Sequence, residues 1–444
     1  MCDNQKPAPP ATAFSLIRTA LPIGAFYLTE IIVGLTDLAV VGALGATELA
    51  AVGLGKTILL SVMVIGFAVL SVATVLMAES LRPSRCGAVV LASIIIVIPI
   101  SGLALIAAHA SSVILHASGY DPELVAAFES YADILAWAIA PTLLFAVFKN
   151  VLIAVGKTSI ITWLSVGIVA GNLVASIVFV HGIGDWPGIG VAGAALATVA
   201  VNAIATAAII FVVLRAGYVR LQKLGSGVVL RFMTDILRLG WAAGAQQALE
   251  SVLFIVVLYL LGLYSTAWLA AGTVVFTVME LNFAASGALG EVLSARIAAA
   301  RSQGRGAIRR LLRLSSILTS LVAICLGFTF GVFAEATVSL FSSSDIQTDG
   351  RLLMISLLQW TAPFFVADAL QVLYIHALRG LRQTVMPMIL STSCYWVIGL
   401  GGGMFIAEPL GFGPPGIWIG FCLGLSSAAV LLATMAFRAA KHFS

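Results

Sequence analysis

The chain has 444 residues, of which 61% are hydrophobic and only 9% are charged, and its formal net charge at pH 7 is +4. Soluble proteins carry about 25% charged residues, so this composition excludes a water-soluble enzyme of this length. The apolar stretches, such as residues 87–108, are continuous rather than alternating, which excludes a transmembrane β-barrel. We therefore expect an all-α polytopic membrane protein.

Apolar runs of spanning length recur along the whole chain, and one helical span needs about 20 apolar residues. Turn-rich breaks, such as residues 118–122 and 411–415, separate the runs. The twelve predicted transmembrane helices are residues 14–42, 50–78, 87–109, 123–153, 159–181, 189–215, 231–262, 267–297, 308–341, 351–378, 384–407 and 414–438.

Basic residues predict the orientation of these spans. All but two of the 23 lysines and arginines fall toward one side of the membrane, the exceptions being Lys56 inside the second span and Arg351 in an opposite loop. The positive-inside rule then places both termini in the cytoplasm. We expect a multi-pass protein of the cytoplasmic (inner) membrane.

The sequence also contains an internal repeat. Arg18–Ala51 aligns without gaps to Arg238–Ala271, and Glu30 then matches Glu250. We expect two pseudo-symmetric six-helix lobes, which could rock against each other in alternating access. The predicted divisions are a cytoplasmic tail at 1–13, an N-lobe at 14–216, a cytoplasmic linker at 217–228, a C-lobe at 229–438 and a cytoplasmic tail at 439–444.

Very few acidic residues lie inside the apolar spans. They include Glu30 and Asp37 in span 1, Glu250 in span 7, Glu280 in span 8 and Asp368 in span 10. An ionised acid at the bilayer centre costs about 2.5–3.5 kcal/mol, so each must be neutral, paired or facing a wet cavity. Such a carboxylate can bind a proton, an alkali cation or a cationic substrate in exchange for one another. We predict that Asp37, Glu250 and Asp368 carry the coupling cation or proton.

Three other polar residues lie at membrane depth: Glu30, Glu280 and Asn172. Glu30 lies seven residues before Asp37, so the two share one helix face, and Glu30 would tune the N-lobe. Glu280 either joins the cavity or is hydrogen-bonded to neighbouring helices. Asn172 in span 5 either lines the cavity or bridges helices.

Two further patterns are set aside. Residues 50–57, which include Lys56, fit a loose phosphate-loop pattern, but that loop needs a preceding strand and a soluble nucleotide pocket. The five cysteines have no metal-ligand spacing. We expect no cofactor, and no metal beyond a possible Na⁺ at Glu250 and Asp368.

In this order and spacing, the sequence motifs resemble the MATE (multidrug and toxic compound extrusion) family along nearly the whole chain. In the first half the resemblance rests on Pro22, Gly34–Leu35–Thr36–Asp37–Leu38–Ala39–Val40–Val41–Gly42, Leu49–Ala50–Ala51–Val52–Gly53, Gly171–Asn172 and Gly190–Val191–Ala192–Gly193–Ala194–Ala195–Leu196–Ala197–Thr198. In the second half it rests on Glu250 with Phe254, Asp368 with Gln371, Leu378–Arg379–Gly380, Pro387 and Gly416–Ile417–Trp418–Ile419–Gly420. The resemblance implies a V-shaped pair of six-helix lobes and export driven by a proton or sodium gradient.

The sequence departs from the family pattern at two positions. Ser176 stands four residues after Asn172, where proton-coupled members often have an aspartate. Phe364 stands one turn before Asp368, where some sodium-coupled members have a tyrosine. The coupling ion is therefore left open between Na⁺ and H⁺, with a preference for Na⁺ at the C-lobe pair.

Our hypothesis is a secondary antiporter that exports small, often cationic organic compounds, and not an enzyme. The expected partners are a small-molecule substrate and membrane lipid, without nucleic acid, and the chain is expected to be a monomer. Glu30, Asn172, Phe254, Phe364 and Glu280 are the candidate residues of the substrate or secondary cavity. One alternative is a flippase of lipid-linked precursors from the same superfamily, which would need basic residues in its cavity. Another is a membrane-embedded enzyme, which would form product without any gradient.

Overall fold

The computed structural model describes residues 12–221, 225–339 and 348–442. Outside these ranges lie residues 1–11 and 443–444 of the predicted tails, residues 222–224 of the predicted linker, and the end of the predicted span 308–341. Across the described ranges the chain is helical, with turns and one isolated bridge between Ile183 and Trp186. This agrees with physical expectation, because a helix pairs its own backbone groups where lipid offers no hydrogen bonds.

The helices follow one another with short connections. The first half contains α1 (Ala13–Gly42), α2 (Ala46–Leu70), α3 (Val72–Ala78), α4 (Pro83–Ala117), α5 (Pro122–Leu135), η1 (Ala136–Ala138), α6 (Ile139–Ala154), α7 (Ser159–His181) and α8 (Val191–Arg215). The second half contains α9 (Ser226–Tyr264), α10 (Thr266–Ala300), η2 (Arg301–Gln303), α11 (Arg305–Val332), α12 (Ala334–Ser339), α13 (Thr348–Thr361), η3 (Ala362–Phe364), α14 (Phe365–Gly380), α15 (Val385–Ser393), η4 (Cys394–Gly401), α16 (Gly402–Ala407), α17 (Pro414–Ala439) and η5 (Ala440–His442).

Within the described ranges, twelve helical segments are long and apolar enough to cross a membrane, which confirms the predicted number. Each overlaps one predicted span. Several run further than predicted: α4 extends to Ala117, and α9 has 39 residues. Helices of this length exceed the roughly 30 Å hydrocarbon core and must tilt or project from it.

The fourth and tenth spans are each interrupted by one turn of tighter 3₁₀ helix, η1 and η3. A proline accompanies each interruption: Pro141 follows η1 closely, and Pro363 lies within η3. Proline cannot donate to the carbonyl four residues earlier, so the regular α pattern is broken at these points. The two breaks occupy corresponding spans of the two halves.

The caps of the last span in each half also correspond. Gly190 precedes α8 with φ 60° and ψ −136°, and Gly413 precedes α17 with φ 61° and ψ −145°. Both conformations lie in the positive-φ region that glycine adopts without a steric penalty. The matching backbone geometry supports the pseudo-symmetry predicted from the sequence repeat.

By packing, the chain divides into two compact units. The first-half unit comprises Ala25–Gly244, and the second-half unit combines Ala245–Ser444 with Met1–Gly24. Helices α1 and α9 therefore each contribute to both units, and the two division points, Gly24 and Gly244, are partners in the sequence repeat. The predicted lobes at 14–216 and 229–438 follow the topological halves of the sequence and stay a prediction.

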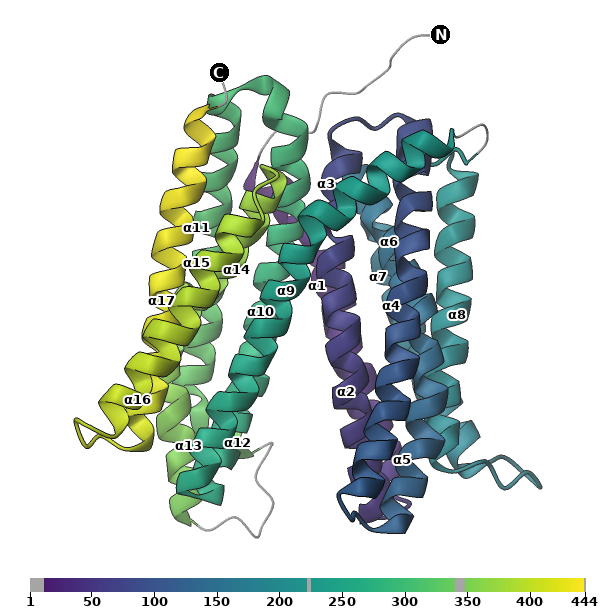
Figure 1. Cartoon of the computed structure of the whole chain (residues 1–444), viewed down its shortest axis with the longest axis vertical. Coiled ribbons are helices and arrows are strands. Elements are labelled where there is room, and N and C mark those ends of the chain that lie inside the picture. The colour runs from purple at the N-terminus through teal and green to yellow at the C-terminus, as the bar shows by residue number, and fades with distance from the viewer. Residues whose placement is uncertain (1–11, 222–224, 340–347, 443–444) are drawn as a thin grey trace. The chain divides into compact units, whose positions relative to one another are not determined.

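Close helix packing fixes the elements that carry the polar residues. In the first-half unit α7 packs on α8 and α2 packs on α5; in the second-half unit α14 packs on both α10 and α17 (Figure 1). Helices α16 and α17 approach so closely that a Cβ added to Gly420 would lie 2.2 Å from the Cα of Gly403. Small residues permit this approach, as in many membrane helix pairs.

Candidate functional site

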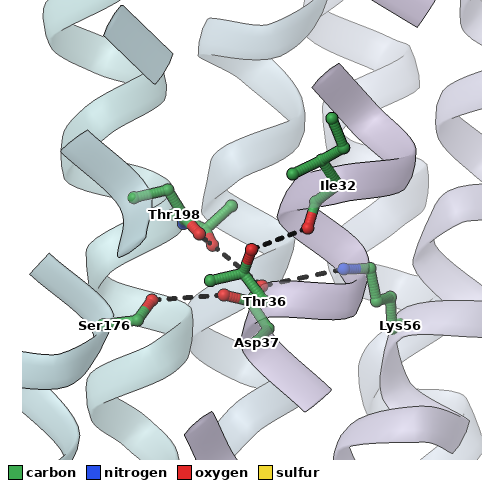
Figure 2. A network of polar contacts seen from close by, with 7 residues as sticks. Ile32, Thr36, Asp37, Lys56, Ser176 and Thr198 are labelled. Carbon is green, nitrogen blue, oxygen red and sulfur yellow. Dashed lines mark hydrogen bonds and ion pairs between the residues drawn. The ribbon is translucent and has the colours of Figure 1, made fainter. Parts of the chain in front are cut away.

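Asp37 is the centre of the polar cluster in the first-half unit. It lies on α1 near its C-terminal end, and only 1% of its surface is exposed. The Ser176 hydroxyl of α7 donates to its Oδ1 at 3.2 Å, and the Thr198 hydroxyl of α8 donates to its Oδ2 at 3.3 Å (Figure 2). Two helices therefore supply hydroxyl donors to this one carboxylate.

Asn172 completes the α7–α8 side of the cluster. Its Nδ2 donates to Thr198 Oγ1 at 3.0 Å, so the hydroxyl accepts from Asn172 while it donates to Asp37. This is the helix-bridging geometry, one of the two alternatives for this residue. The Asn172 Oδ1 atom is buried and has no hydrogen-bond partner in the part of the chain that the structure describes. The Oδ1 atom of Asn172 is therefore a buried acceptor without a donor among the described residues.

Lys56 of α2 approaches Asp37 from the other side (Figure 2). Its Nζ lies 3.7 Å from Asp37 Oδ2, and the lysine side chain is 21% exposed against 1% for the aspartate. Gly34, one turn before Asp37, leaves room for this approach, because a Cβ there would lie 2.8 Å from the Lys56 Nζ. The cluster therefore contains a carboxylate and an ammonium group in contact.

Glu30 lies two turns before Asp37 on α1 and is only partly buried. The charges of Lys56 and Lys149 both act on its carboxyl group. Lys149, which the charge bias of the sequence assigns to the cytoplasmic side, is instead buried within α6 at 3% exposure. Its Nζ lies 4.6 Å from the centre of the Phe26 ring and 5.2 Å from that of Tyr27. Cation–π contacts of this kind stabilise an ammonium group away from water.

Glu250 and Asp368 form the polar cluster of the second-half unit. Glu250 lies on α9 and Asp368 in the first turn of α14, with exposures of 7% and 4%. Gln371, one turn after Asp368, donates from Nε2 to Glu250 Oε1 at 3.5 Å and is also a hydrogen-bond partner of the Asp368 carboxyl. The structure thus joins two carboxyl groups that are far apart in the sequence through a single amide.

Two neutral side chains hold this pair in place. Asn282 of α10 donates from Nδ2 to Asp368 Oδ2 at 2.8 Å and to the Phe365 carbonyl oxygen at 3.0 Å. The Tyr395 hydroxyl donates to Gln371 Oε1, which fixes the orientation of the glutamine amide. Each donor group is buried, so the carboxyl groups are held by protein dipoles rather than by bulk water.

The aromatic candidates lie in different surroundings. Phe254 is partly buried and belongs to an aromatic group in which its ring centre lies 5.0 Å from that of Phe276 and 5.7 Å from that of Phe421. Phe364 is partly buried in η3, immediately before the helix that carries Asp368. Their predicted contact with substrate stays a prediction.

Glu280 differs from the other acids. It is exposed on α10, and no hydrogen bond or ion pair joins it to another of the described residues. The alternative of a buried acid bonded to neighbouring helices is therefore wrong for this structure. Glu280 belongs to neither the Asp37 cluster nor the Glu250–Asp368 pair.

Several members of the two clusters are not among the residues predicted from the sequence. The sequence places Lys56 inside the second span and in a loose phosphate-loop pattern, and a lone lysine in an apolar span is itself a signal that a partner is near. Thr198, Asn282 and Tyr395 carried no such signal, because hydroxyl and amide residues are common in membrane helices. Only the packing shows which of them reach a carboxyl group.

The chain is similar to known proteins over most of its length. The family model MatE matches residues 22–181 and 242–404. The chain is 29% identical over 436 residues to the probable multidrug resistance protein NorM of Agrobacterium fabrum, covering 93% of this chain and 90% of that protein. It is 30% identical over 446 residues to the probable multidrug resistance protein NorM of Rhizobium meliloti, covering 95% and 92%.

The fold is also similar to solved structures. The Vibrio cholerae MATE transporter VcmN in its bent form superposes with a TM-score of 0.83 over 97% of this chain and 98% of that one, at 19% identity. At that identity the likeness concerns the fold, which includes the twelve helical spans described above.

Proposed function

Because this chain belongs to the MatE family of membrane transporters, we propose that it is a secondary antiporter that exports small, often cationic organic compounds in exchange for Na⁺ or H⁺. Relatives at 29–30% identity are probable multidrug resistance proteins, which supports export of foreign compounds. The proposed cycle is alternating access, in which binding of the coupling cation and binding of substrate exclude each other.

The observation that carries this proposal is the Glu250–Asp368 pair. Two buried carboxyl groups share Gln371, and their other described hydrogen-bond partner is the neutral Asn282. Like charges this close are unfavourable in a medium of low dielectric, so the pair favours binding of a proton or a small cation. Release of that cation would leave negative charge available to a cationic substrate.

The proposed energy source for export is the electrochemical gradient of the coupling cation. An inward-moving monovalent cation gains about 2.3 kcal/mol per 100 mV of membrane potential, beside its concentration gradient. Both Na⁺ and H⁺ fit a carboxylate pair, and we favour Na⁺ at Glu250 and Asp368. Asp37 is the corresponding acid of the first-half unit, and the residues proposed to line the substrate or secondary cavity are Glu30, Asn172, Phe254, Phe364 and Glu280.

The proposed setting is the cytoplasmic membrane of a bacterium, with a monomeric chain and both termini in the cytoplasm. The twelve spans and the bacterial relatives support a multi-pass location. The even number of spans and the distribution of basic residues support the orientation.

The flippase alternative requires cations that can hold phosphate groups. Two basic side chains do lie at membrane depth, but Lys56 contacts Asp37 and Lys149 lies over aromatic rings. These arrangements favour charge balance within the protein over recognition of a phosphate. The antiporter therefore remains the function that the geometry supports best.

The test is efflux of a fluorescent cationic dye from proteoliposomes with imposed pH or Na⁺ gradients. We expect Glu250→Gln and Asp368→Asn each to reduce gradient-driven efflux by about tenfold or more, because contacts to a buried charge contribute about 1.5–3 kcal/mol. Glu335→Gln is the matched control, since Glu335 is 77% exposed and its one ion pair within the described residues is with Arg351 at 3.4 Å. Unimpaired efflux in both acid variants would overturn the proposal.

A further inference from the structure

The two carboxylate clusters differ in their charge. In the first-half unit, Asp37 has an ammonium group 3.7 Å from its Oδ2 atom. In the second-half unit, the Asp368 carboxyl group acts on Glu250 as a like charge, and Arg379 is the one cation that acts on Glu250 among the described residues. The Asp37 carboxyl group thus has an ammonium group beside it, whereas the Glu250 carboxyl group has a second acid acting on it.

The chain is built so that Lys56 reaches Asp37. The lysine side chain passes over Gly34, where a Cβ would lie 2.8 Å from Nζ and 3.1 Å from Cε. The hydroxyls of Ser176 and Thr198 approach the carboxylate from the opposite side, from α7 and α8 (Figure 2). The ammonium group thus occupies the side of the carboxylate that those two donors leave open.

The first-half unit contains a second acid close to Lys56. Glu30 lies on the same face of α1 and experiences the charges of both Lys56 and Lys149. Tyr131 is the other titratable group on which the Asp37 charge acts. Two acids and two lysines therefore stand together in the interior of the first-half unit.

We propose that the ammonium group of Lys56 is a tethered counter-cation that takes the place of a free coupling cation at Asp37. This inference rests on the proposed antiport function and deepens it: exchange of the coupling ion is confined to Glu250 and Asp368. The first-half unit then keeps a constant charge through the transport cycle, and Asp37 exchanges neither a proton nor Na⁺ with solution.

The Lys56→Met variant provides the decisive comparison, because it removes the ammonium group and leaves an apolar side chain of similar length. Asp37 then has to acquire a cation from solution, since an uncompensated buried carboxylate is unfavourable. Either a proton or Na⁺ then binds to the Asp37 carboxylate. Lys56→Gln offers a second neutral variant, and Lys56→Arg preserves the charge.

The experiment uses purified full-length protein in detergent and two readouts, infrared spectroscopy of carboxyl groups and equilibrium binding of ²²Na⁺. Subtraction of the Asp37→Asn spectrum isolates the Asp37 contribution. In the wild type and Lys56→Arg we expect Asp37 to show no carbonyl stretch of a protonated carboxylic acid. In Lys56→Met or Lys56→Gln we expect either that band or one additional bound Na⁺ per chain, and neither in the double variant Lys56→Met with Asp37→Asn.

Two outcomes would overturn the inference. One is a protonated Asp37 in the wild type, and the other is a folded Lys56→Met protein that gains neither a proton nor Na⁺. A lysine with a purely structural role would change stability but not the number of bound cations. Because both readouts need no transport, an absence of gradient-driven efflux in the wild type would refute the antiport function separately.

Discussion

Gln371 Nε2 lies 3.5 Å from Glu250 Oε1, and the same glutamine is a partner of Asp368, one turn earlier on α14. Its Oε1 atom accepts a hydrogen bond from Tyr395. The amide therefore has its donor end directed at the carboxyl pair and its acceptor end held by a hydroxyl group. This arrangement makes Gln371 the residue that links the two acids.

Replacement of this linking residue should impair coupling. We expect Gln371→Leu to lower gradient-driven dye efflux by about tenfold, because hydrogen bonds to charged groups contribute about 1.5–3 kcal/mol. The measurement is the initial rate of efflux from proteoliposomes at equal protein content. Gln359→Leu is the control, since Gln359 is exposed on α13. Equal rates in the two variants would contradict the linking role.

Asn282 should matter for stability as well as for the acid pair. Its Nδ2 group serves both Asp368 and the Phe365 carbonyl oxygen, and thereby joins α10 to the start of α14 after the break at η3. Asn282→Leu leaves both acceptors buried without this donor, at a cost of about 1–3 kcal/mol for each. We expect a lower Tm of the purified protein in detergent.

The control for Asn282 lies in the other unit. Asn202 Nδ2 donates to Thr142 Oγ1 at 2.9 Å, a bond between neutral groups. Asn202→Leu should lower Tm less than Asn282→Leu, because bonds between neutral groups contribute only about 0.5–1.5 kcal/mol. The reverse order of the two Tm values would refute this account of Asn282.

The contact between α16 and α17 predicts a large difference between two glycine substitutions. A Cβ at Gly420 would lie 2.2 Å from Gly403 Cα and 2.3 Å from its N atom, so the two backbones must separate in Gly420→Ala. At Gly402, by contrast, a Cβ meets no atom within 4 Å. Thermal unfolding in detergent should show a clear loss of stability in Gly420→Ala and little change in Gly402→Ala. Similar Tm values for both variants would show that the helices are not in close contact.

The position of Ser176 beside Asp37 allows a negative charge to be added to the first-half cluster. Its hydroxyl lies 3.2 Å from Asp37 Oδ1, so Ser176→Asp brings a second carboxyl group against the first. Adjacent carboxylates in a buried site cannot both be ionised, and the single cation of Lys56 balances only one of them. The rate of dye efflux driven by a pH gradient, without a Na⁺ gradient, should differ from the wild-type rate in Ser176→Asp. It should not differ in the uncharged Ser176→Asn. An identical response of both variants would exclude an added proton site.

Much of the fold could be predicted from local sequence alone. Continuous apolar runs determine helical spans, because in lipid each segment must pair its own backbone groups. The interruptions of the fourth and tenth spans coincide with Pro141 and Pro363, but Pro22 and Pro99 lie within unbroken helices, so proline alone does not determine where a span is interrupted. The acids Asp37, Glu250 and Asp368 were recognisable because charge is rare and costly at membrane depth.

Tertiary structure decided the partners of those acids. No local pattern relates Lys56 to Asp37 or Asn282 to Asp368, since each pair lies on different helices and meets only when these helices pack. The buried position of Lys149 could not be predicted either, because a lysine near the end of a span is expected on the cytoplasmic side. The sequence by itself determined where charge enters the membrane, through the local free energy of inserting each helix. Helix packing alone determined which charges are balanced, because electrostatic contacts depend on distances between segments that are remote in the chain.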